Sequence, residues 1–232
     1  MKRLLFLAAL LLGTAAWATP PRITASEDRM MAATQTHLYV LREIVDNLGS
    51  HYTGLHDQHL VEISLESGAA TRFWPLRRMH VNRLPENNFV LPGEVQDLDG
   101  STADLTAVLR EVGAQPIAPS AWGAEEVTFD NGALSLKGEV ALTPFGIRAL
   151  GRGQLAILRD AYPAIETADE HGAGKRIDFY DLYAKGDWLC VLHPETSVLF
   201  RAAEKLIITK LHCQDAELNG VWSFHAILKD DL

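Results

Sequence analysis

Alternation of apolar and polar residues is clearest in the last third of the chain. A period of two predicts strands over 177–183, 188–192 and 206–213. A last strand follows Asn219-Gly220, with Trp222, Phe224, Ala226 and Leu228 on one face and Ser223 and His225 on the other. Consecutive strands joined by short turns predict an antiparallel meander, in which one face of the sheet packs on the core and the other is solvated.

A second β region is predicted in the first hundred residues. Residues 59–65 alternate, 66–69 supply a turn, and 71–76 return as a second strand. Pro75 cannot donate a backbone hydrogen bond, so it confines the return strand to a sheet edge or ends it. Residues 36–48 fit a helix by their apolar spacing and a strand by their β-branched and aromatic composition. We favour a strand for this segment.

The middle of the chain combines two helix signals with a tight hairpin. An apolar stripe predicts a helix over about 103–112, capped by Ser101 or Thr102 and ended by Gly113. Asn131-Gly132 lies between two short apolar runs and predicts a hairpin with a tight primed turn. Thr143-Pro144 is typical of a helix N-terminus, but three glycines interrupt the segment that follows, so we expect either a second, broken helix over about 144–160 or a strand.

These elements together predict a mainly β or α+β protein. We expect antiparallel meander sheets, one helix near 103–112 and a second, broken helix near 144–160. The length fits a single globular domain over 19–232 that can bury a sizeable core. Pro116 and Pro119 make 114–121 the candidate for a boundary between subdomains.

The first 18 residues have the pattern of a secretory signal peptide. Lys2-Arg3 gives a positive start, Leu4 to Leu12 form an apolar core, and Ala16-Trp17-Ala18 is a small-x-small cleavage signature. The apolar core is too short to span a bilayer as a helix. We therefore expect cleavage after Ala18, a periplasmic or secreted protein, and no transmembrane segment in the mature chain.

The net charge of the chain indicates which classes of partner it can bind. The formal net charge is −9, and loss of Lys2 and Arg3 with the signal peptide makes it −11. A chain this acidic, with no basic run, repels the phosphate backbones of DNA and RNA. We therefore expect no nucleic-acid partner.

Export changes the interpretation of the two cysteines, Cys190 and Cys213. In an oxidising compartment such a pair favours a disulfide. Closing a loop of this size stabilises a fold by about 3 kcal/mol on the chain-entropy model. The spacing is not Cys-x-x-Cys, so it gives no support to a thioredoxin-like redox role.

One group of residues has the composition of a metal site: His51, His56, Asp57 and His59. Imidazole and carboxylate ligands bind zinc, copper or nickel, and three of them can leave an open coordination position. The spacing does not match the helical H-E-x-x-H motif. His59 also shares a predicted strand face with Val61 and Ile63, which suits a buried structural imidazole. A divalent transition metal is the one cofactor that the sequence suggests.

Other catalytic motifs are missing from the sequence. It contains no G-x-S-x-G nucleophile elbow. Gly151-Arg152-Gly153 lacks the remaining residues of a phosphate-binding loop, so we interpret it as a point of local chain flexibility. We predict a non-catalytic exported protein that binds an envelope protein or a small ligand. The alternative is a metal-binding protein or metal-dependent hydrolase that uses His51, His56, Asp57 and His59.

Overall fold

The structure is a computed structural model of the whole chain. It describes residues 22–47, 49, 53–82, 95–97, 103–117, 127–136, 138–161, 165–168, 174–177, 188–193, 199–201, 206–216 and 220–229. The predicted signal peptide, residues 1–18, lies outside the described residues. Most of the strand expected over 177–183 and the second half of the candidate boundary at 114–121 also lie outside them.

Strands dominate the described part of the chain, so the prediction of a β-rich α+β fold is confirmed. The strands before the first helix are β1 (Thr24–Ala33), β2 (His37–Asp46), β3 (Thr53–Ser64), β4 (Ala70–Asn82) and β5 (Val95–Asp97). Those after it are β6 (Gln115–Pro116), β7 (Val127–Asp130), β8 (Ala133–Leu136), β9 (Glu139–Leu142), β10 (Ile165–Ala168), β11 (Gly174–Ile177), β12 (Trp188–Leu192), β13 (Leu199–Arg201), β14 (Leu206–Asp215) and β15 (Gly220–Lys229). The two described helices are α2 (Leu105–Glu111) and α3 (Pro144–Ala161).

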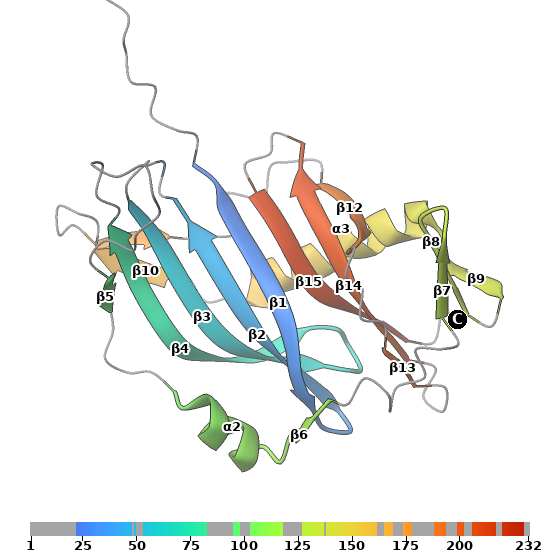
Figure 1. Ribbon diagram of the computed structural model, residues 1–232, viewed down its shortest axis with the longest axis horizontal. Coiled ribbons are helices and arrows are strands. Elements are labelled where there is room, and N and C mark those ends of the chain that lie inside the picture. The colour runs from blue at the N-terminus through green and yellow to red at the C-terminus, as the bar shows by residue number, and fades with distance from the viewer. Residues whose placement is uncertain are drawn as a thin grey trace, which may run out of the picture.

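Ten of the described strands form one large sheet with the order β12-β14-β15-β1-β2-β3-β4-β5, and β13 and β6 pair with β14 and β1 (Figure 1). The expected antiparallel hairpins are present on both sides of this sheet. The first and last strands, however, pair in parallel, from Thr24 opposite Gly220 to Glu27 opposite Ser223. We call this β1–β15 pairing the seam, because it joins strands from the two ends of the chain into one sheet.

The favoured strand over 36–48 is confirmed as β2, which pairs along its whole length with β1 and β3. The predicted return strand is longer than expected and runs through Pro75 as β4. Pro75 lies opposite His59 at a register shift, and β5 pairs only with Met79, His80 and Val81 of β4. The missing N–H of Pro75 therefore falls where the β4–β5 ladder does not reach, which is how an inner strand accommodates it.

The predicted first helix is confirmed as α2, although its cap differs from the expected one. The side chain of Asp104, not Ser101 or Thr102, accepts a hydrogen bond from the Ala107 backbone N–H at 2.8 Å. Gly113, with φ of 68°, follows the C-cap as predicted. The expected hairpin is also confirmed: β7 and β8 pair around Asn131 and Gly132, whose φ angles are 50° and 74°.

The second helix is continuous rather than broken. Thr143 Oγ1 accepts a hydrogen bond from the Gly146 N–H at 3.1 Å, and Pro144 occupies the first turn. Gly151 lies against the sheet and is buried. A Cβ atom added there would overlap the Cys190 Sγ atom and approach Cys213 Sγ to 2.9 Å. The flexibility interpretation of Gly151 is therefore wrong: the glycine lets the helix backbone approach a disulfide.

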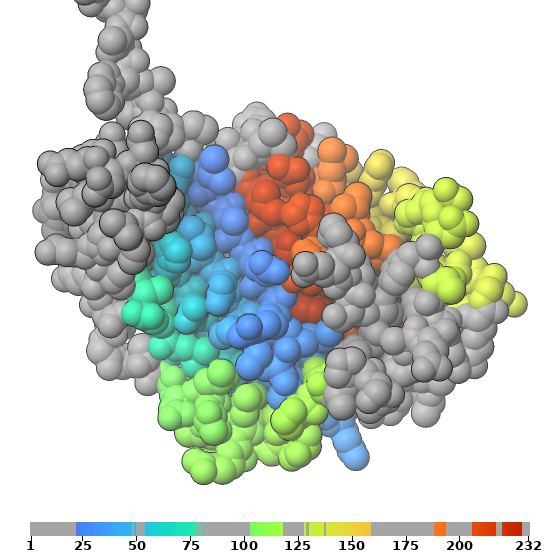
Figure 2. Space-filling model, viewed as in Figure 1, coloured from blue at the N-terminus to red at the C-terminus, as the bar shows by residue number. Residues whose placement is uncertain are grey.

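Different helices pack on the two faces of the large sheet. On one, the α3 face, residues such as Val40, Val61 and Phe224 share a buried cluster with Ile147 and Leu155 of α3. On the other, the α2 face, Tyr39 and Leu60 pack with Val108 of α2 at one end of the sheet. Side chains of β1, β2, β14 and β15 are visible on the α2 face in Figure 2.

Burial differs from the expected pattern in β15. Trp222 and Phe224 are buried on the α3 face, as predicted, but Ser223 and His225 on the α2 face are also only 5% and 4% exposed. The face expected to be solvated therefore holds buried polar groups at this point. The α2 face above the seam is therefore polar but not fully solvated.

The two glycines of α3 give a matched test of the packing at the disulfide. A Cβ at Gly151 would clash with the cystine, whereas one at Gly153 meets no atom within 4 Å. We expect Gly151→Ala to lower the free energy of unfolding by about 2–3 kcal/mol through overpacking. Gly153→Ala should raise it by about 1 kcal/mol, because alanine is the better helix former. Urea denaturation of the oxidised proteins measures both, and effects of the same sign would contradict the packing described.

Candidate functional site

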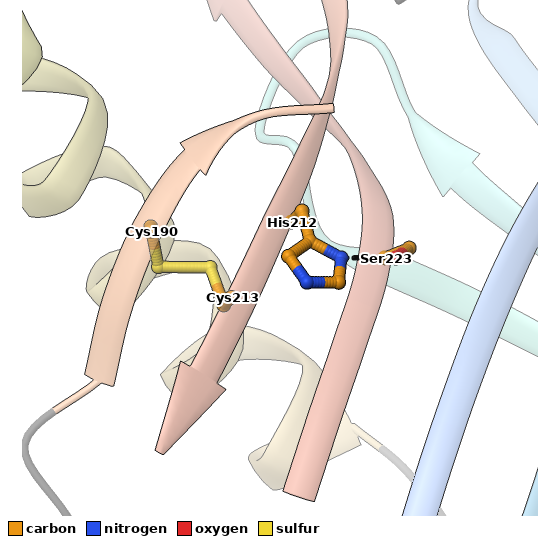
Figure 3. Close-up of a disulfide and its surroundings, with 4 residues drawn as sticks. All are labelled: Cys190, His212, Cys213 and Ser223. Carbon is orange, nitrogen blue, oxygen red and sulfur yellow. Dashed lines mark hydrogen bonds between the residues drawn. A yellow bond between two sulfur atoms is a disulfide. The ribbon is translucent and has the colours of Figure 1, made fainter. Parts of the chain in front are cut away.

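The predicted disulfide is confirmed. Cys190 of β12 and Cys213 of β14 lie directly opposite each other, with an S–S distance of 2.01 Å (Figure 3). Both residues are almost completely buried, on the α3 face beside Gly151. The bond therefore holds the outer strand of the sheet and lies directly under the helix that covers the core.

The four residues of the predicted metal site are not gathered in one place by the described strands. Asp57 and His59 lie two positions apart on the α3 face, both buried, with 3.6 Å between His59 Nδ1 and Asp57 Oδ1. His56 lies between Val45 and Met79 in the register, and strand alternation places it on the opposite face from Asp57. His51 lies outside the described residues.

No group of three or more His, Cys, Asp or Glu side chains among the described residues is arranged to hold a metal ion. The contact between Asp57 and His59 agrees with the buried structural imidazole that the strand pattern suggested. Metal binding at these four positions stays a prediction.

A buried ion pair on the α3 face was not predicted from the sequence. Both carboxylate oxygens of Asp28 in β1 accept hydrogen bonds from Arg42 in β2, each at 2.7 Å, and neither side chain is exposed. The Arg42 guanidinium also lies over the Trp222 ring of β15, 5.6 Å from its centroid. A signal was present: Arg42 occupies the same period-two face as Leu38, Val40 and Ile44, where a charge is expected only if it is paired.

On the opposite face, five polar side chains meet above the seam. We call them the seam cluster: Glu27 of β1, Ser223 of β15, Lys210 and His212 of β14, and His193 directly after β12. Lys210 Nζ donates a hydrogen bond to Glu27 Oε1 at 2.7 Å, across the intervening strand β15. His212 Nδ1 and Ser223 Oγ share a hydrogen bond of 2.9 Å (Figure 3).

The register explains why these residues converge. Glu27 lies opposite Ser223, and Ser223 lies opposite His212, so the three form one row across three strands on one face. In the next row the backbone N–H of His193 donates to the carbonyl of Lys210 at 2.9 Å. The rings of His193 and His212 are 6.0 Å apart between centroids and meet edge to face. The sequence could not place these residues together, because the rows depend on the parallel seam.

The pKa values of Glu27 and His225 are shifted by burial and by the charged groups around them. The hydrogen bond from Lys210 lowers the pKa of the Glu27 carboxyl, against the opposing effect of partial burial, and His193 and His212 lower it further. Burial lowers the pKa of His225 from 6.5 to about 4. The Asp28 carboxylate opposes this shift, while Lys210, Arg42 and His193 reinforce it.

Ser223 and His212 have the residue types of a nucleophile and its base, but their surroundings do not suit acyl transfer. That chemistry needs free N–H groups aimed at the developing oxyanion. Ser223 lies within β15 between β14 and β1, where the backbone is paired on both sides, and its side chain is buried. The arrangement instead supplies an imidazole nitrogen, an ammonium and a carboxylate, which together suit recognition of a polar group.

Comparisons with known proteins give no relative from which a role could be inferred. No protein-family model matches the sequence, and neither the curated proteins nor the solved structures contain a significant match. Among the described residues, no helix has the length and apolar character required to cross a membrane.

The buried imidazole of His225 gives a prediction for the pH dependence of stability. Between pH 6.5 and about 4 the unfolded chain binds a proton at His225 that the folded protein does not bind. The stability that depends on a neutral His225 imidazole is therefore fully present above pH 6.5. The free energy of unfolding then falls with pH through this window, by up to about 1.4 kcal/mol per pH unit. Urea denaturation across the window measures the slope. We expect His225→Phe to have a smaller slope than the natural protein, and an unchanged slope would contradict the assignment.

Proposed function

We propose that this chain is an exported, non-catalytic protein that binds a polar ligand or an envelope protein through the seam cluster. The observation that carries the proposal is the convergence of Glu27, Lys210, His212 and Ser223 from both ends of the chain on one row-wise patch. Such groups are costly to gather and partly bury, so their concentration above the seam favours a binding role over a purely structural one.

Two features support the exported location. The first 18 residues have the order of segments that a signal peptide requires. The Cys190–Cys213 disulfide is buried between the sheet and α3. A disulfide of this kind persists in an oxidising compartment such as the periplasm or the extracellular space. We therefore propose a periplasmic or secreted location after cleavage following Ala18.

The chemistry of the cluster suggests the class of ligand. Lys210 donates to Glu27, so a ligand carboxylate or phosphate would compete with Glu27 for the ammonium group. Ser223 holds one ring nitrogen of His212, which leaves the other as a donor or acceptor of fixed direction. A small molecule with carboxylate and hydroxyl groups, or a peptide segment with an acidic side chain, would satisfy both.

A binding screen with a matched histidine control tests this function. His37 is the control, because its Nδ1 also shares a hydrogen bond of 2.8 Å with a hydroxyl, that of Thr36, at the β1–β2 turn. We expect a panel of carboxylates, phosphate and acidic peptides to contain a ligand that shifts the His212 imidazole signals in NMR spectra. His212→Ala should weaken its binding about tenfold or more, the loss of roughly one charge-assisted hydrogen bond, and His37→Ala should leave it unchanged. Equal losses in both variants would contradict the proposal.

The proposal that the protein is non-catalytic can be tested separately. We expect a fluorophosphonate probe to leave Ser223 unlabelled, because the described backbone around it is paired with β1 and β14 and the Ser223 side chain is buried. A covalent adduct on Ser223, found by mass spectrometry and lost in His212→Ala, would show an activated nucleophile and would contradict this part of the proposal.

A metal-dependent role at His51, His56, Asp57 and His59 is the alternative function. Asp57 and His59 lie close enough to supply two ligands, with 3.6 Å between His59 Nδ1 and Asp57 Oδ1, whereas strand alternation places His56 on the opposite face. Stoichiometric zinc, copper or nickel in protein purified without a histidine tag, lost in His56→Ala/His59→Ala, would support the alternative over the seam cluster.

A further inference from the structure

The start of α3 carries the most exposed large apolar side chains among the described residues. Phe145, in its first turn, is 80% exposed. Val140, on the strand that leads into the helix, is 63% exposed. The Phe145 ring is therefore available to contact an apolar phase outside the protein.

Two arginines follow Phe145 on the same stripe of the helix. Arg148 and Arg152 lie three and seven residues after Phe145, a spacing that places all three on one side, and both arginines are exposed. Neither guanidinium forms an ion pair or a hydrogen bond with a described residue. By contrast, Arg22 and Arg42 bind Asp46 and Asp28. The guanidinium groups of Arg148 and Arg152 are therefore available to an anion outside the protein, as far as the described residues show.

The position of this stripe leaves it accessible. Figure 1 shows α3 beginning beside the small sheet β7–β8–β9, at the end of the molecule opposite β4 and β5. The Ile147 and Leu158 side chains of α3 are buried in the core, so the opposite side of the helix carries Phe145, Arg148 and Arg152. We call these three residues the α3 stripe.

We propose that the α3 stripe docks the protein on an anionic phospholipid surface. Phe145 would insert among the lipid headgroups, and Arg148 and Arg152 would bind their phosphates. This combination of an exposed aromatic with basic residues on one helix side is the arrangement that interfacial helices use. The net negative charge of the remaining molecule would repel the same surface, so docking would hold one orientation.

A lipid surface fits the stripe better than an acidic protein does. A protein partner would need a pocket shaped for a single projecting aromatic ring, whereas a bilayer interface accepts such a ring without a preformed pocket. The proposal is independent of the seam cluster, which lies on the α2 face of the sheet, while α3 covers the other face.

Vesicle binding of the oxidised mature protein tests the proposal. We expect it to sediment with vesicles of phosphatidylcholine and phosphatidylglycerol at low salt and to be released when salt is added. We expect no sedimentation with vesicles of phosphatidylcholine alone. Arg148→Gln and Arg152→Gln should each weaken partitioning about fivefold, the equivalent of about 1 kcal/mol per arginine near an anionic surface. Phe145→Ser should weaken it as well.

Arg110→Gln is the matched control. Arg110 is an exposed arginine in the other helix, α2, and its replacement makes the same change in net charge. We expect this variant to bind vesicles as the natural protein does, with unchanged thermal unfolding in all variants. No sedimentation with phosphatidylglycerol vesicles, or an equal loss in Arg110→Gln, would overturn the proposal. Arg148-dependent capture of an acidic protein without vesicle binding would also overturn it, in favour of a protein partner.

Discussion

The fold depends on the pairing of its first strand with its last. β1 and β15 run in parallel over a short register, and each is the inner neighbour of a group of antiparallel strands. On the α3 face, Arg42 of β2 binds Asp28 of β1 and lies over Trp222 of β15, so one buried side chain links three adjacent strands. On the α2 face, Lys210 of β14 reaches Glu27 of β1. Charged contacts therefore cross the seam on both faces.

A buried ion pair is not by itself a source of stability, because removing both charges from water costs about as much as their attraction returns. Its effect here is on specificity. An alternative register of β1 against β2 would leave Asp28, Arg42 or both buried without their partner, at a cost of several kcal/mol. The β1–β15 and β14–β15 registers place Glu27, Ser223 and His212 in one row. The contacts that cross the seam, Arg42 over Trp222 and Lys210 to Glu27, hold together the alignment on which the proposed binding cluster depends.

Local patterns in the sequence predicted the local elements well. The Asn131-Gly132 turn, the Thr143-Pro144 helix start and the alternation in β14 and β15 each depend on residues within a few positions of one another. The seam could not be predicted in this way, because Glu27 and Lys210 are 183 positions apart. Gly151 was misinterpreted for the same reason: its role depends on cysteines about 40 and 60 positions later, which no local pattern reports. Arg42 at a core position was the one signal that could have indicated the buried pair.

Native-state hydrogen exchange on the natural protein and Asp28→Asn tests the central role of the seam most directly. The substitution leaves Arg42 buried without its charged partner and should cost about 3–5 kcal/mol. If the seam joins both strand groups into one cooperative unit, amides of β2 and β3 and amides of β14 and β15 should lose protection by the same amount. A loss confined to β1 and β2, with β14 and β15 protected as before, would show that the two groups unfold independently and would contradict this account.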